Sequence, residues 1–222
     1  PGMQSFRSDP GDFAVSARGF VGEFSNKLLV LVDGRSIYTP TFAGVEWMFD
    51  EGLLENIERI EVIRGPGAAL WGSNAVNGII NIITRHSDDT QGAFATATAG
   101  TTEEWYEALR YGGTAGKDIS YRAYIKQMQY GTVDNPRQSE PELVRSGFRV
   151  DWTPSEENAF LLTGAYYNSH EKSWTRRPLL TPVPRSIDVK GHGYFSGLHI
   201  MGRWEHTFAP DYDGLSPYHD GG

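Results

Sequence analysis

Apolar and polar residues alternate along the C-terminal two thirds of the chain. From residue 144 to 152 the even positions hold Val, Ser, Phe, Val and Trp, whereas the odd positions hold Arg, Gly, Arg and Asp. Residues 119–127 and 198–205 show the same alternation. A period of two places successive side chains on opposite faces of a strand. These segments are therefore predicted to be strands with one apolar and one polar face.

The spacing of these strands indicates how they are connected. Short turns after residues 113 and 152 alternate with long connections after residues 130 and 168. This order, with strands of about 10 residues, is typical of an outer-membrane β-barrel. A soluble β-sandwich has the same two-faced strands, so on periodicity alone it remains an alternative. Six strands are expected, over about residues 92–100, 104–113, 118–130, 143–153, 158–170 and 194–208.

The first 85 residues follow a different pattern, in which short apolar runs are separated by turns. Asp33-Gly34 is typical of a tight hairpin turn, and Asp33 is interpreted as turn chemistry alone. One or two helical turns are expected in the acidic stretch before residue 57. Strands are predicted at Leu28–Val32, Ser36–Tyr38, Ile60–Ile63 and Ile79–Ile83. This part of the chain is predicted to be a small α+β domain.

Composition narrows the classes of function. The net charge of −8, from 28 acidic and 20 basic residues, argues against nucleic acid as a partner. The chain contains no cysteine, which excludes disulfides and thiolate metal sites within it. No apolar run approaches the roughly 18 residues of a membrane helix. The start shows neither an initiator methionine nor a signal peptide, so we expect a fragment cut at both ends.

Three motifs in the N-terminal part carry a resemblance to a known family. They are SARGF at 16–20, LLVLVDGRSIY at 28–38 and IERIEVIRGPGAALWGSNAVNGIINIITR at 57–85. In this order the chain resembles, over residues 13–85, the plug domain of TonB-dependent outer-membrane receptors. The resemblance implies a plug domain over residues 1–88, without its N-terminal part, and the first six strands of a transmembrane β-barrel over residues 89–222. The family's intact barrel has about 22 strands, a size whose lumen would otherwise be open.

The resemblance also implies a function, which is not enzymatic. Such receptors import a scarce nutrient chelate (a ferric siderophore, cobalamin or a similar ligand) across the outer membrane of a Gram-negative bacterium. TonB transmits energy from the proton-motive force through an N-terminal box, which is expected to be missing from this sequence. The implied partners are TonB, the chelate and outer-membrane lipid, with no cofactor. A passive porin-like channel and a soluble β-rich binding domain are the alternatives.

The resemblance assigns roles to several residues. Arg18 and Arg64 match two plug arginines that pair with barrel-wall glutamates in the family, since a guanidinium can hold carboxylates by forked hydrogen bonds. The alternative for Arg64 is an arginine in a solvated turn. Glycines at Gly34, Gly65, Gly67, Gly72 and Gly78 are expected to permit turns and close backbone approach. Candidate ligand-facing loop residues are Tyr38, Thr41, Phe42 and Trp47; the alternative is a loop packed inside the lumen.

Two further groups of residues lie in the strand-rich part. Trp105, Trp152 and Trp204 occur near predicted strand ends and are interpreted as interfacial anchors of a membrane barrel. The long connection after residue 168 contains four polar residues that are expected in a solvated loop, namely His170, Glu171, Arg176 and Arg177. The alternative is that they contact substrate.

Overall fold

The strands of the described residues form a six-stranded sheet, a four-stranded sheet and a two-stranded hairpin. The computed structural model describes residues 3–9, 12–17, 28–39, 44–50, 52–65, 71, 75–101, 103–131, 140–179 and 185–208. The hairpin pairs β1 (Met3–Asp9) with β2 (Asp12–Ala17). No helix within these ranges is long and apolar enough to cross a membrane.

The four-stranded sheet has the order β4-β3-β6-β5. Its strands are β3 (Leu28–Val32), β4 (Arg35–Ser36), β5 (Ile57–Arg64) and β6 (Gly78–Thr84). Strands β3 and β6 are parallel, and the other pairs are antiparallel. Two short helices, α1 (Trp47–Asp50) and η1 (Leu54–Asn56), connect β4 to β5. We refer to β1 to β6 with these two helices as the N-terminal domain; its α+β organisation is as predicted.

The parallel pair at the centre of this sheet is buried on both faces. Leu28 and Val30 of β3 belong to one apolar cluster, whereas Leu29 and Leu31 belong to another on the opposite face. Continuous apolar runs such as LLVLV are typical of strands covered on both sides. The N-terminal domain therefore has a core of its own.

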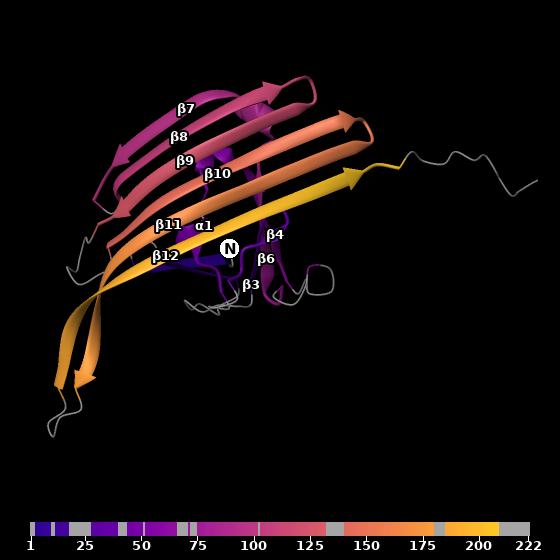
Figure 1. The fold of residues 1–222 in the computed structure, drawn as a ribbon. Coiled ribbons are helices and arrows are strands. Elements are labelled where there is room, and N and C mark those ends of the chain that lie inside the picture. Colours follow the sequence, from indigo (N-terminus) through magenta and orange to yellow (C-terminus); the bar gives the residue numbers. More distant parts are fainter. Residues whose placement is uncertain are drawn as a thin grey trace, which may run out of the picture.

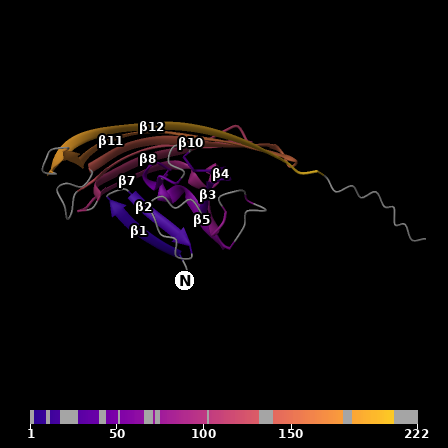
Figure 2. The same cartoon turned by 90° about the horizontal axis from the view of Figure 1, so that it is seen from below.

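Six antiparallel strands form a broad curved sheet, here called the wall, in the order β12-β11-β10-β9-β8-β7 (Figure 1). The short helix η2 (Ser87–Thr90) leads from the N-terminal domain into the wall. Figure 2 shows the wall arching over the N-terminal domain, which lies on its concave side. The wall strands are β7 (Gly92–Ala99), β8 (Glu103–Ala115), β9 (Ile119–Tyr130), β10 (Glu140–Ser155), β11 (Asn158–Leu179) and β12 (Arg185–His206).

The two faces of the wall differ as the alternation predicts. On β10 the odd residues Arg145, Arg149 and Asp151 are buried toward the N-terminal domain. The even residues Val144 and Phe148 point the other way and are exposed. The wall thus has a concave face that carries its buried charged residues and that the N-terminal domain covers, and an apolar convex face, which no described residue covers. Part of the concave face is apolar, since Met128, Tyr130 and Leu143 pack against Met48 and Phe49 of α1.

The prediction of a solvated loop after residue 170 is wrong. Strands β11 and β12 continue as a hairpin with unbroken pairing from Asn158↔His206 to Leu179↔Arg185, and Figure 1 shows this hairpin reaching beyond the other strands. Antiparallel pairing satisfies the backbone groups of both strands even where no core supports them. The loop residues of that prediction, His170, Glu171, Arg176 and Arg177, therefore all lie in β11.

Candidate functional site

Basic residues gather on the concave face of the wall, where the N-terminal domain covers it. Arg122 and Lys126 project from β9, and Arg145 and Arg149 project from β10; all four are at least 92 % buried, the most exposed being Arg149 at 8 %. Burying charges is costly unless each charge finds hydrogen-bond partners. The partners of these cations therefore decide what the interface can do.

The cations of the wall donate hydrogen bonds to oxygens of the N-terminal domain. Arg145 donates to the carbonyl of Phe49, at the end of α1, and its Nε donates to Tyr124 Oη at 3.2 Å. Lys126 Nζ lies 3.4 Å from the carbonyl of Gly52. On β8, Arg110 donates to the side-chain oxygen of Asn56 at 2.8 Å. The wall thus supplies donors for oxygens in and between the two short helices.

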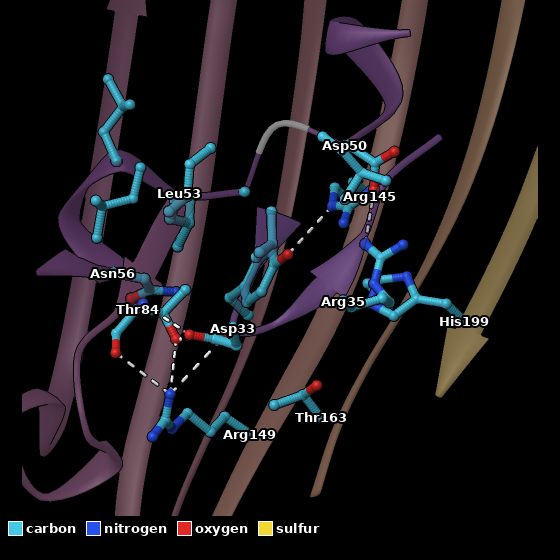
Figure 3. A pocket seen from close by; sticks show the side chains of 18 of the residues that line it. Asp33, Arg35, Asp50, Leu53, Asn56, Thr84, Arg145, Arg149, Thr163 and His199 are labelled. Atoms are coloured by element: carbon cyan, nitrogen blue, oxygen red, sulfur yellow. Dashed lines mark hydrogen bonds and ion pairs between the residues drawn. The ribbon is translucent and has the colours of Figure 1, made fainter. Parts of the chain in front are cut away.

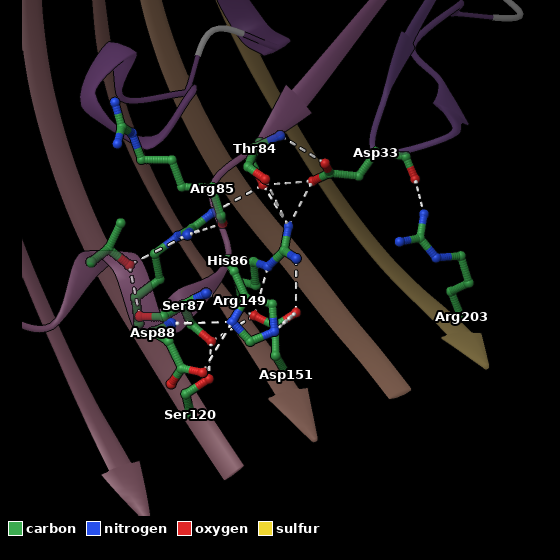
Figure 4. Close-up of polar contacts among 12 residues, drawn as sticks. Asp33, Thr84, Arg85, His86, Ser87, Asp88, Ser120, Arg149, Asp151 and Arg203 are labelled. Atoms are coloured by element: carbon green, nitrogen blue, oxygen red, sulfur yellow. Dashed lines mark hydrogen bonds and ion pairs between the residues drawn. The ribbon is translucent and has the colours of Figure 1, made fainter. Parts of the chain in front are cut away.

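A second group of contacts lies where β6 ends and the chain enters the wall (Figure 4). The Asp33 carboxylate accepts from the Thr84 amide at 2.9 Å and from the Thr84 hydroxyl at 2.8 Å. The same hydroxyl oxygen accepts from Arg149 Nη1 at 2.8 Å and from Arg122 Nη2 at 3.0 Å. Arg149 Nη1 also lies 3.7 Å from Asp33 Oδ2. The turn of β3–β4, the end of β6 and two wall strands therefore meet at one hydroxyl group.

The wall side of this group is itself fixed by a carboxylate. Arg149 Nε and Nη2 each donate to one oxygen of Asp151 at 2.8 Å. The Ser87 amide donates to Asp151 at 2.9 Å, and the Ser87 hydroxyl also donates to it. The Ser87 and Ser120 hydroxyl oxygens are 2.6 Å apart, so Ser120 donates to Ser87. We call this set the junction cluster: Asp33, Thr84, Ser87, Ser120, Arg149 and Asp151.

A cavity of about 340 Å³ lies between the sheet of the N-terminal domain and wall strands β9 to β12 (Figure 3). Most of its lining is apolar, including Leu53, Ile60 and Ile82. Arg35 and Asp50 form an ion pair of 2.8 Å in its lining. Partial burial, and secondly the Asp50 carboxylate, raise the pKa of nearby Glu46. Within the described ranges, no three His, Cys, Asp or Glu side chains are arranged to hold a metal ion.

Three predicted glycines lie in the described residues. Gly34 and Gly65 have φ angles of +88° and +119°, a region that favours glycine. Gly78 has no positive φ, but a Cβ there would lie 2.6 Å from the carbonyl oxygen of Ile63 on β5. Gly67 and Gly72 lie outside the described residues.

The predicted arginines and loop residues are only partly described. Arg64 ends β5, where it pairs with Gly78 and is exposed. Tyr38 is half-buried and donates from its hydroxyl to the Leu28 carbonyl at 3.0 Å, and Trp47 opens α1 and packs against the Leu28 cluster. Arg18, Thr41 and Phe42 lie outside the described residues. The wall-pairing and ligand-facing roles therefore stay predictions.

Sequence reasoning missed the junction cluster. Asp33 was assigned to the turn alone, yet its carboxylate contacts the end of β6 and a wall arginine. The one available signal was the placement of Arg149 and Asp151 on the polar face of a two-faced strand. Alternation shows that such charges face inward, but it does not show which partner they meet.

Comparison with known proteins gives the family. Residues 1–79 match the TonB-dependent Receptor Plug Domain. The chain is 40% identical over 102 residues to the vitamin B12 transporter BtuB of Vibrio vulnificus, covering 46% of this chain and 16% of that protein. It is 30% identical over 155 residues to BtuB of Vibrio cholerae, covering 69% of this chain and 24% of that protein.

A solved structure supports the fold over almost the whole chain. The pyoverdine-bound FpvA of Pseudomonas aeruginosa superimposes with a TM-score of 0.67 at 17% identity, covering 95% of this chain and 29% of that one. The chain spans about a quarter or less of the length of the curated relatives named above. With its plug-domain motifs, its α+β domain and the antiparallel strands that arch over it, the chain belongs to the TonB-dependent receptors.

Proposed function

We propose that this chain works within a transporter that imports a nutrient chelate, such as a ferric siderophore or cobalamin, across the outer membrane with energy delivered by TonB. One observation carries the proposal. The N-terminal domain is held on the concave face of the wall by charge-assisted hydrogen bonds, while the opposite face of the same strands is apolar and exposed. That arrangement suits a domain that blocks the lumen of a lipid-embedded barrel.

The convex face has the dimensions of a membrane surface. Near the short turns, Trp152, Phe160 and Trp204 form a stack with ring centroids 4.9 and 6.2 Å apart. On β12, Tyr194 lies 10 residues before Trp204 on the same face, with exposed apolar residues between them. Ten residues span roughly 33 Å of strand, or about 25 Å along the membrane normal at a tilt of about 40°. This equals the apolar band of outer-membrane barrels, bounded by aromatic residues.

Energy input follows from the requirement for tight capture. A ligand bound with nanomolar affinity and an on-rate near 10⁶ M⁻¹s⁻¹ dissociates at roughly 10⁻³ s⁻¹. Spontaneous inward release is then slow, so work on the N-terminal domain is needed to open a path. Hydrogen bonds between side chains and carbonyls suit such a domain, because water can replace each partner when the contact opens.

The structure weighs against the two alternatives. A soluble binding domain would need to cover or replace the exposed apolar residues of the convex face, such as Phe148, Leu198 and Ile200. A passive channel would need an open lumen, whereas the N-terminal domain lies against the concave face of the wall and buries its charges (Figure 2).

Uptake assays test the proposal. We expect cells that produce the intact receptor to accumulate one ligand from a panel of labelled cobalamin and ferric siderophores. Accumulation should fall at least tenfold when TonB is deleted or a protonophore is added, while surface binding of the ligand persists. Uptake that is unchanged by both treatments would indicate a passive channel instead. Absence of binding and uptake for every chelate in the panel would also contradict the proposal.

A further inference from the structure

We propose that the junction cluster acts as a latch, meaning that its contacts stay intact during import. The N-terminal domain then moves away from the rest of the wall by rotating about the end at which it joins the wall. The inference rests on the proposed function, since it concerns how the same domain clears the path. The latch differs from the contacts expected for Arg18 and Arg64 in which part of the protein supplies the positive charge. There the cation belongs to the N-terminal domain, whereas here Arg149 belongs to the wall and Asp33 to the domain.

The first argument is the density of buried contacts in the cluster. Ser87, Ser120, Asp151 and Arg149 are 0, 3, 5 and 8 % exposed. Arg149 donates two hydrogen bonds to the Asp151 carboxylate and lies 3.7 Å from Asp33 Oδ2. The Thr84 hydroxyl donates one hydrogen bond and accepts two. Opening the cluster would require several charge-assisted hydrogen bonds to break together before water could replace their partners, which is costly in a buried site.

The second argument is the cavity beside the cluster. A mainly apolar cavity of about 340 Å³, lined in part by Asp33, Thr84 and Arg149 of the cluster, separates part of the sheet of the N-terminal domain from β9 to β12. A cavity contributes few dispersion contacts across the interface. We therefore expect a pulling force to separate the domain from the wall across the cavity, and to open the apolar contact of Met48 and Phe49 with the wall, before it breaks the cluster.

The third argument is the path of the chain. Thr84 is the last residue of β6, Ser87 opens η2, and β7 begins at Gly92. The cluster thus lies where the domain is covalently tied to the wall. A short covalent link surrounded by several polar contacts can act as a hinge. The link between β6 and β7 would set the axis of rotation, and the latch would keep the two parts aligned there.

A disulfide across the latch tests whether it opens. The Ser87 and Ser120 hydroxyl oxygens are 2.6 Å apart, which is close enough for cysteine sulfurs at those positions to bond. The chain itself contains no cysteine. In the intact receptor carrying Ser87→Cys and Ser120→Cys, we expect the oxidised and reduced forms to import ligand at rates within twofold. Thiol labelling would establish the extent of oxidation, and each single cysteine variant under the same oxidant is the control.

The outcomes separate this inference from the proposed function. If import falls at least tenfold on oxidation and returns with reductant, the latch proposal is wrong, but the proposed function of TonB-driven import still stands. An unaltered receptor without energy-dependent import would instead refute the proposed function.

A second variant covers the case in which the cysteine pair disturbs folding. Arg149→Gln should loosen the latch, so we expect at least a tenfold higher leak of a large antibiotic per receptor in the outer membrane without ligand. A merely structural role for Arg149 would lower the amount of receptor but not raise the leak per receptor. Lys117→Gln, which removes one charge from an exposed turn, is the matched control. An unchanged leak in Arg149→Gln would overturn the latch.

Discussion

Single residues of the N-terminal domain are constrained by backbone contacts that the sequence only suggests. Gly78 matches a plug motif, and turn chemistry would be the usual explanation for a glycine there. Instead, its Cα faces the Ile63 carbonyl of the neighbouring strand at the point where Arg64 pairs with it. Gly34 is different, since its φ of +88° favours glycine even though no atom lies near the missing Cβ. The two glycines are therefore needed for separate physical reasons.

Gly78→Ala should destabilise the N-terminal domain by about 1–3 kcal/mol, because the added methyl would push β5 away from β6. The measurement is urea-induced unfolding of the intact receptor in detergent, followed by tryptophan fluorescence. Gly202→Ala is the matched control, since a Cβ there would meet no atom within 4 Å. Equal midpoints for the two variants would show that the close approach at Gly78 has no energetic consequence.

Along single strands of the wall, successive residues face the convex and the concave side in turn. On β12, Leu198, Ile200 and Trp204 are exposed on the convex face, whereas Met201 points to the concave side and is partly covered. The same alternation brings Arg145 and Arg149 of β10 onto the covered face. A strand in this wall can therefore hold an exposed apolar residue and a buried arginine at adjacent positions, as Val144 and Arg145 do.

Ile200→Arg should cost about 2–4 kcal/mol of barrel stability, because it places a charge on the lipid face near the middle of the apolar band. The adjacent variant Met201→Arg adds the same side chain on the concave face and should cost less than half as much. Heat-modifiable mobility of the intact receptor in gels and the yield of inserted barrel measure the difference. Equal losses for the two variants would argue against a lipid-facing convex surface.

At the scale of the whole molecule, the wall is an open sheet. Its outer strands, β7 and β12, each have a neighbour on one side only among the described residues. Unpaired backbone groups cost several kcal/mol each in hydrocarbon, so a membrane sheet is stable only when its edges are closed. The apolar convex face and the open edges together make this wall dependent on further strands.

Residues 1–222 produced alone should therefore fail to insert stably into bilayers. We expect the protein to be extracted by urea or alkali from liposomes and to run at the same gel position with and without heating. The intact receptor, treated in parallel, is the control. Stable, heat-modifiable insertion of residues 1–222 would mean that six strands suffice.

The sequence by itself determined the class of protein, most of the strands and the direction of their faces. Alternation is a local consequence of strand geometry, so Val144 and Phe148 could be assigned to one face and Arg145 and Arg149 to the other without a structure. The motifs around Arg18, Asp33 and Arg64 indicated the family. The length of β11 and β12 was not predictable in this way, because their outer halves contain charged residues, and in β11 also Pro178, which are equally common in loops.

Only the tertiary structure decided which polar groups meet. Asp33, Thr84 and Arg149 lie far apart in the chain and on three different strands or turns, yet they share one set of hydrogen bonds. Their meeting depends on how the curvature of the wall fits the N-terminal domain, and no local pattern encodes that fit. The faces of strands follow from the backbone of each strand, whereas the contacts between the two parts follow from packing one whole sheet against another.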